Sequence, residues 1–219
     1  MVVAALGIVA VVLSGGAKAI VVGGPTLPST PVRAKMVTLA ESQVGYRTSP
    51  TNSYCNKFSA FWGAGTATCG SGLRSEEWCA DFAAWVWYKA GAHVTYSYTT
   101  GDVNAAAASF YYWAVAHGTW HAVDSGYVPQ PGDVAVYGLN VTTGTASHVA
   151  VVTSYTSGAK GPNAVNGDGD TTGFSVVEAR TDEYRADVPG RAGALSGYAS
   201  PIIPHPKPTA TTGTAATTG

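Results

Sequence analysis

The sequence predicts an α+β domain in which helices come first and an antiparallel β-sheet follows. In the first half of the chain, apolar residues recur at three- and four-residue spacing, the period of a helix packed on one side. After Pro131, short valine-rich runs alternate with turn residues, as in strands. Because no helical crossover separates these runs, we expect the strands to pair antiparallel, with the N-terminal helices packed on the sheet.

The composition suits one domain of ordinary size. The chain has 219 residues, of which 46% are apolar and 11% charged, and its formal net charge is -1. The apolar content is ample for a buried core. A nearly neutral chain without a basic patch argues against nucleic acid as a partner. We expect a monomer that needs no cofactor.

The N-terminal segment is predicted to direct export. Residues 1–13 are almost continuously apolar, and Ala17-Lys18-Ala19 has the small-x-small pattern of a signal peptidase site. We therefore expect a signal peptide over residues 1–19 and a secreted, cell-wall-associated protein without stable membrane insertion. An uncleaved anchor is the alternative, although the run is short for a membrane span of ~20 residues.

The remaining segments divide by composition. Residues 20–31 are rich in Gly, Pro, Ser and Thr and are predicted to be a linker. The folded domain is expected over residues 32–203. Residues 204–219 combine Pro, Thr, Ala and Gly with almost nothing to bury, so we expect a disordered tail.

Three helices are predicted from the apolar spacing. Their expected ranges are 34–44, 79–90 and 103–116. A glycine that can end a helix follows each range: Gly45, Gly91 and Gly118. The aromatic residues 110–113 of the third helix are assigned to the core, because such rings mainly supply buried area.

Three strands are predicted in the second half, over residues 134–137, 148–155 and 173–178. Between the last two, residues 166–170 read Asn-Gly-Asp-Gly-Asp, which indicates a turn-rich hairpin loop. A calcium loop is the alternative, but Thr171 and Val177 stand where its glycine and bidentate glutamate belong.

No metal ligand set is assigned elsewhere. His117 and His121 are four residues apart, but Gly118 interrupts the helix that would align them, and no accompanying ligands are visible. We therefore expect no zinc site.

The three cysteines predict one disulfide and one thiol in an exported protein. Cys55 and Cys69 could close a loop of about fifteen residues, which would stabilise the fold by on the order of 3 kcal/mol. Cys79 then keeps its thiol. The alternative is that Cys79 is paired and another cysteine is spare.

Cys79 stands where a polar stretch turns into the apolar pattern of the second predicted helix. Amide N–H groups and the positive end of the helix dipole at a helix start favour thiolate over thiol. The thiolate is the form that attacks a carbonyl carbon, so this position predicts a nucleophile.

A thiol hydrolase also needs an imidazole and a polar group that orients it. His148 begins the long predicted strand, and Glu178 ends the next one, so both could meet Cys79 at one edge of the sheet. Other polar side chains could replace Glu178 in the orienting role, namely Asn166, Asp168 and Asp170.

Five blocks, taken in this order, resemble the CHAP family of cysteine, histidine-dependent amidohydrolases/peptidases. The resemblance extends over about residues 34–180. The blocks are Gly45-Tyr46, residues 56–63 (NKFSAFWG), residues 77–82 (EWCADF), residues 131–134 (PGDV) and residues 148–152 (HVAVV).

This resemblance implies a papain-like fold, shared with NlpC/P60 enzymes, and cleavage of amide bonds in bacterial peptidoglycan. By the family pattern, Cys79 matches the nucleophile, His148 the general base and Glu178 the orienting acid. Arg180 stands where the family pattern has Asn, which puts amide-mediated help near the oxyanion in question. We expect the aromatic residues that could line a substrate groove to be Trp62, Trp78, Tyr111 and Trp120.

The resemblance does not decide between an endopeptidase and an N-acetylmuramoyl-L-alanine amidase. Two other functions also stay open. One is a cell-wall binding module of the same fold that has lost turnover, and the other is an amide hydrolase or effector acting on another extracellular substrate.

Overall fold

The computed structural model describes residues 30–51, 53–169, 175–181 and 193–204. The predicted signal peptide lies outside the described residues, as do almost all of the predicted linker and tail. Within these ranges, no helix combines the length and apolarity needed to cross a membrane.

A six-stranded antiparallel sheet forms the centre of the fold, in the order β3-β8-β4-β5-β6-β7. Its strands are β3 (Trp120–Ala122), β4 (Val134–Tyr137), β5 (His148–Ser154), β6 (Asn163–Gly169), β7 (Val176–Arg180) and β8 (Leu195–Ala199). A separate two-stranded ladder joins β1 (Cys55–Asn56) to β2 (Arg74–Ser75).

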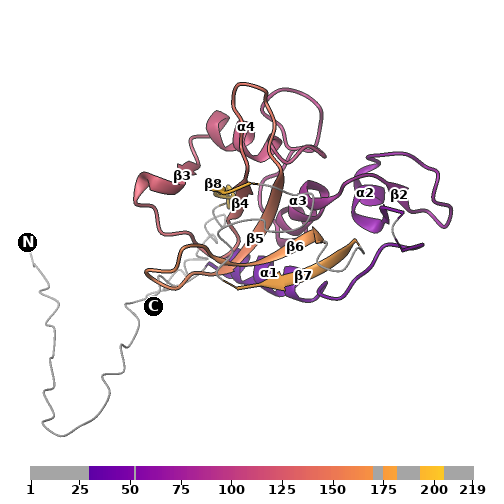
Figure 1. The fold of residues 1–219 in the computed structure, drawn as a ribbon, viewed down its shortest axis with the longest axis horizontal. Helices are drawn as coiled ribbons and strands as arrows, with labels where there is room; N and C mark the ends of the chain where they lie inside the picture. The colour runs from indigo at the N-terminus through magenta and orange to yellow at the C-terminus, as the bar shows by residue number, and fades with distance from the viewer. Residues whose placement is uncertain (1–29, 52, 170–174, 182–192, 205–219) are drawn as a thin grey trace, which may run out of the picture.

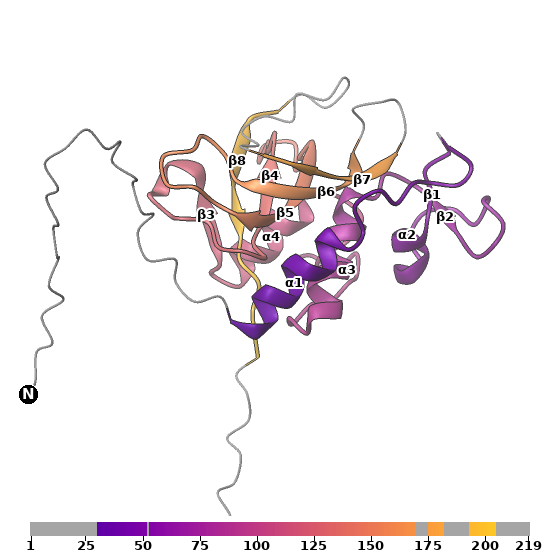
Figure 2. The ribbon, with the colours of Figure 1, turned by 90° about the horizontal axis from the view of Figure 1, so that it is seen from below.

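Helices α1 (Pro31–Glu41), α3 (Cys79–Ala90) and α4 (Ser109–Ala116) cover one face of this sheet. Helix α2 (Lys57–Trp62) packs on α3 and β2 instead, and a 3₁₀ turn, η1 (Val123–Ser125), follows β3. Helix α3 contacts β5 and β6, and α1 packs beside it (Figures 1 and 2). The predicted α+β class, with helices packed on an antiparallel sheet, is confirmed.

The core consists of two clusters on opposite faces of the sheet. The larger one lies between the helices and the sheet and combines aromatic side chains of α3 and α4 with inward valines: Phe82, Trp87, Phe110, Trp113, Val134, Val136, Val149, Val151 and Val165. The smaller one covers the other face and includes Tyr137, Ala150, Val152, Ala164 and Tyr198. Side chains alternate between the two faces along each strand, so β4, β5 and β6 are buried on both sides.

The helix at residues 79–90 is confirmed at the predicted bounds, and it ends at Gly91 in the left-handed region (φ 100°). Helix α1 was expected over residues 34–44 but begins at Pro31. The side chain of Thr30 accepts a hydrogen bond from the Arg33 N–H (3.3 Å), and Pro31 suits the first helical position. The helix therefore begins three residues earlier and ends three residues earlier than expected, and it takes in Pro31, the last residue of the predicted linker.

The helix predicted over residues 103–116 was wrong in its first half, since α4 begins at Ser109. Asn104 accepts from the Ala106 N–H (3.0 Å), and Ser109 Oγ accepts from the Asn104 N–H (3.1 Å). These local side-chain hydrogen bonds hold the backbone in a turn and compete with the helical ladder.

Helix α2 lies within a segment that was expected to be a loop. Asn56 caps it, because its side-chain oxygen accepts from the N–H groups of Phe58 (2.9 Å) and Ser59 (2.8 Å). Gly63 ends the helix in the left-handed region (φ 70°).

Strand β6 corrects the prediction of a hairpin loop beginning at Asn166. Residues 163–165 pair with β5, and residues 164–166 and Gly169 pair with β7, although Asn, Gly and Asp are unusual in strands. Burial between two neighbours outweighs local propensity here. Strands β3 and β8, which were not predicted, extend the sheet beyond β4. The predicted strand at 173–178 begins at Val176 within the described residues.

Candidate active site

Cys79 is the first residue of α3, and 6% of its surface is exposed. Its thiol is outside the disulfide, which joins Cys55 to Cys69 as predicted. Trp78 occupies the N-cap position but makes no side-chain cap of its own. The start of this helix therefore depends on acceptors from other elements for its first N–H groups.

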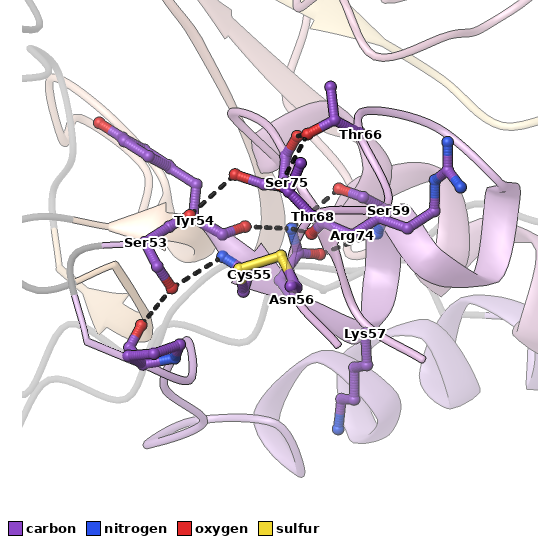
Figure 3. Close-up of a disulfide and its surroundings, with 12 residues drawn as sticks. Ser53, Tyr54, Cys55, Asn56, Lys57, Ser59, Thr66, Thr68, Arg74 and Ser75 are labelled. Atoms are coloured by element: carbon purple, nitrogen blue, oxygen red, sulfur yellow. Dashed lines mark hydrogen bonds between the residues drawn. A yellow bond between two sulfur atoms is a disulfide. The ribbon is translucent and has the colours of Figure 1, made fainter. Parts of the chain in front are cut away.

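The disulfide holds α2 in a position that reaches α3. Cys55 precedes Asn56, whose amide donates to Ser59 Oγ (2.9 Å), as Figure 3 shows around the yellow sulfur bridge. Ser59 Oγ in turn donates to Asp81 Oδ2 (2.6 Å), on the first turn of α3. The chain of contacts runs from the disulfide to the helix that carries Cys79.

His148 begins β5 and is 2% exposed. Its Nε2 lies 2.7 Å from Oδ1 of Asn166 on the neighbouring strand. Tyr137, directly opposite on β4, places its ring centroid 6.2 Å from the imidazole. The ring thus has a defined polar partner on one side and an aromatic neighbour on the other.

The residues after Asn166 contact the start of α3. Gly167 lies so close to Phe82 that a Cβ at this position would overlap the phenyl side chain. Asp168, which is 1% exposed, accepts a hydrogen bond at Oδ2 from the backbone N–H of Trp78 (3.2 Å). His148 therefore contacts Asn166, and the start of the helix that carries Cys79 contacts the next two residues of β6.

Glu178 lies on β7 directly opposite Asn166 in the strand register. Its Oε1 accepts hydrogen bonds from Nε (2.9 Å) and Nη2 of Arg180, which makes an ion pair within the strand. Among the alternatives to Glu178, Asn166 is the residue that contacts the imidazole and Asp168 the one that contacts α3. Asp170 lies outside the described residues.

Sequence reasoning missed an acid pair beside the helix start. Asp81 is fully buried and accepts hydrogen bonds from Ser59 and from the Tyr96 hydroxyl. The pKa of Glu76 is raised to about 8, mainly by burial and to a smaller extent by the neighbouring Asp81. Burial and the Asp81 carboxylate also raise the pKa of Tyr96. In the sequence, the signal for this pair was Glu76, three residues before Cys79, and Asp81, two residues after it.

The expected groove aromatics do not share one environment. Trp78 is fully buried and stacks on Phe58, with ring centroids 5.3 Å apart, so it belongs to the core and cannot line a groove. Trp62 is half-buried and stacks on Tyr96 at 4.4 Å. Tyr111 and Trp120 contact each other edge to face at 5.0 Å.

The segment that raised the calcium alternative is occupied by protein contacts at two of its oxygen-bearing side chains. Asn166 meets His148, and Asp168 meets Trp78 and Ser175. Among the residues that the structure describes, no three His, Cys, Asp or Glu side chains gather in a way that could hold a metal ion.

Comparison with known proteins identifies one family. The family model of the CHAP domain matches residues 70–165, just under half of the chain, and the match includes Cys79 and His148. The resemblance noted from the sequence blocks is thereby confirmed over these residues, which are similar to the CHAP domain. No curated protein matches the chain.

Two solved structures share a partial likeness. The structure of NlpC1 from Trichomonas vaginalis is 11% identical at a TM-score of 0.40, over 79% of this chain and 45% of that one. The structure of NlpC2 from the same organism is 11% identical at a TM-score of 0.39, over 78% of this chain and 47% of that one. This chain therefore spans less than half the length of either.

Proposed function

We propose that the protein hydrolyses amide bonds in bacterial cell-wall peptidoglycan with Cys79 as the nucleophile, a proposal that the match of residues 70–165 to the CHAP family model supports. The observation that carries the proposal is the 2.7 Å contact between His148 Nε2 and Asn166 Oδ1, made beside the helix start that bears Cys79. A thiol, an imidazole and a side-chain amide are the groups of a papain-like cysteine hydrolase.

Asn166 would orient the base directly. An amide oxygen accepts hydrogen bonds and cannot donate them, so Nε2 carries the hydrogen in this pair. Nδ1 is then the ring nitrogen that takes the proton from Cys79 Sγ. The orienting role predicted for Glu178 is thus given to Asn166. Glu178 lies opposite Asn166 on the neighbouring strand β7, where we assign it a supporting role.

The reaction proceeds through a thioester. The Cys79 thiolate attacks the scissile carbonyl carbon, and the carbon–nitrogen bond breaks as His148 Nδ1 returns its proton to the leaving amine. The same nitrogen then deprotonates a water molecule. Attack of the resulting hydroxide on the thioester breaks the carbon–sulfur bond and regenerates the thiolate.

The oxyanion would be stabilised at the start of α3. The Trp78 N–H already donates to Asp168, which removes it from the set of groups that could serve this purpose. The backbone N–H of Cys79 is the donor that we assign to the oxyanion, as expected for the first residue of a helix.

The substrate is an amide of peptidoglycan, either in the peptide cross-links or at the junction of stem peptide and sugar. Export, a monomeric state and association with the cell wall belong to the same proposal. The disulfide between Cys55 and Cys69 supports export, because such bonds persist in oxidising compartments.

Mass spectrometry of fragments released from purified cell walls tests this function. The wild type should release peptide-containing fragments, and the new termini distinguish an endopeptidase from an amidase. Cys79→Ala should release none while keeping the thermal stability of the wild type. Asp124→Asn, which alters an exposed side chain in η1, serves as the control and should release the same fragments as the wild type.

Two outcomes would replace the proposal with one of its rivals. Wild-type protein that binds cell walls and releases nothing would be a binding module. Protein that neither binds nor cleaves walls, but whose Cys79 is alkylated readily, would act on another extracellular amide.

A further inference from the structure

Asp168 is a buried carboxylate that the reaction described above does not use. It is 1% exposed, and its two oxygens have separate partners, the Trp78 N–H at Oδ2 and the Ser175 hydroxyl at Oδ1. A buried carboxylate is costly unless hydrogen bonds satisfy it, so its position calls for a reason.

The backbone at Asp168 is held in an unusual conformation. Its φ is 55°, in the left-handed region that residues other than glycine rarely adopt. The regular register between β6 and β7 shifts between Asn166 and Gly169, around this residue. Such a residue persists only where the surrounding contacts fix it, and strained positions of this kind gather at functional sites.

Asp168 performs the capping function that α3 lacks locally. Trp78, at the N-cap position, provides no side-chain acceptor, and the carboxylate of Asp168 reaches in from the sheet to accept the Trp78 N–H. One residue earlier, Gly167 lets the strand backbone approach Phe82 without an intervening side chain. The separation between β6 and the start of α3 is thereby set by direct contact.

We propose that Asp168 is a positioning residue that, together with Asn166, holds the thiol-bearing helix start and the imidazole of His148 at a fixed distance from each other. The inference rests on the proposed thiol mechanism. Asn166 and Asp168 are two residues apart on one strand, so displacement of one end moves the other. A misplacement of about 1 Å can lower the rate of an enzyme about 100-fold.

The same carboxylate has an electrostatic consequence for Cys79. The helix dipole stabilises a negative charge at the helix N-terminus, whether it is on the Asp168 carboxylate or on the Cys79 thiolate. When the carboxylate is already charged, its repulsion opposes formation of the thiolate. Other ionisable groups around this helix start include Arg74, Glu76, Glu77, Asp81, Tyr96 and His148. Asp168 thus improves geometry while making the thiolate harder to form.

Two substitutions separate these effects. Asp168→Asn keeps an oxygen that can accept from the Trp78 N–H and removes the charge, whereas Asp168→Ala removes both. We expect Asp168→Ala to lower kcat on cell-wall fragments by roughly 10- to 100-fold with a smaller change in KM. We expect Asp168→Asn to recover most of kcat and to shift the pH profile of Cys79 alkylation by iodoacetamide to lower pH.

Asp124→Asn, which alters an exposed carboxylate in η1, is the matched control and should change neither quantity. Thermal unfolding of each variant shows whether it folds. If Asp168→Ala does not fold, the alkylation profile of Asp168→Asn alone tests the inference. The inference is overturned if Asp168→Ala keeps wild-type kcat, or if the alkylation profile of Asp168→Asn coincides with that of the wild type. Failure of the proposed function would look different, because the wild type itself would then release no fragments.

Discussion

At the scale of single residues, an amide and a carboxylate affect an imidazole differently. A carboxylate fixes the ring and also stabilises its charged form, whereas an amide fixes the ring without adding charge. Asn166 contacts His148 at 2.7 Å, and the nearby carboxylate of Glu178 is ion-paired with Arg180. The orienting role is therefore assigned to Asn166, with Glu178 placed one strand further away.

Replacing Asn166 with Ala should lower kcat by roughly 10²- to 10³-fold, because the imidazole loses the contact that sets its tautomer and angle. The measurement is kcat on purified cell-wall fragments. Glu178→Gln is the comparison, and we expect a smaller effect, since Glu178 lies on β7 opposite Asn166 and is ion-paired with Arg180. A larger loss in Glu178→Gln than in Asn166→Ala would return the orienting role to Glu178.

Glu76 provides a pH-dependent contribution to stability. Its pKa is raised from 4.5 to about 8 by burial and by Asp81, so the folded protein binds this proton more tightly than the unfolded chain does. The resulting stabilisation is complete below the unfolded pKa and is lost as the pH rises through about 8.

Glu76→Gln should consequently flatten the dependence of Tm on pH between about pH 4.5 and 8, and the variant should be more stable than the wild type at the upper end. The measurement is thermal unfolding across this range. Exposed Glu77 supplies the matched variant Glu77→Gln, which should keep the wild-type profile. Parallel profiles for Glu76→Gln and the wild type would contradict the buried acid pair.

At the scale of elements, the contact between β6 and α3 determines whether the site can form. Gly167 is needed for this approach because a side chain there would overlap Phe82. Gly167→Ala should destabilise the protein by about 1–3 kcal/mol through overpacking, and it should lower kcat as well. Thermal unfolding and wall cleavage measure the two effects.

Gly158→Ala is the control for this substitution. Its added Cβ meets no atom within 4 Å, although the residue has a positive φ of 84°. It should therefore show backbone strain alone, with kcat unchanged. Wild-type kcat in Gly167→Ala would mean that the separation of β6 from α3 does not limit the reaction.

The disulfide is a second link between elements, because it holds the segment from which Ser59 reaches Asp81. Replacing Cys55 and Cys69 together with Ser should lower the free energy of unfolding by about 3 kcal/mol, given the 14-residue separation. Denaturant unfolding provides the value. Titration of the unfolded, unreduced wild type should find one thiol per chain, and a second or third thiol would contradict the pairing.

Elements with a clear apolar period were predictable, and elements defined by tertiary pairing were not. The bounds of α3 followed from its apolar spacing and from Gly91. The second half of strand β6 was interpreted as a loop because Asn166, Gly167 and Asp168 favour turns, whereas the pairing of Asn166 and Gly169 with β7 continues the strand across them. The partner of His148 depends on that pairing, so the sequence could name Asn166 as a candidate but could not select it.

At the scale of the whole molecule, helices cover one face of an antiparallel sheet, and the proposed site lies where α3 begins against β5 and β6 (Figure 2). The order of helices before strands predicted this architecture from the sequence. The added strands β3 and β8 were not predictable, because they are set by tertiary pairing, β8 with β4 and β3 with β8. The CHAP match extends over residues 70–165, which include Cys79 and His148 and end directly before Asn166.

The pairing of Cys79 with His148 is the claim that every step of the mechanism requires. The rate of Cys79 alkylation by iodoacetamide as a function of pH tests it most directly, in the wild type and in His148→Ala. An imidazole beside the thiol should allow alkylation well below the ordinary thiol range near pH ~8.5, and His148→Ala should move the profile up to that range. Identical profiles for the two proteins would contradict the pairing and the thiol mechanism with it.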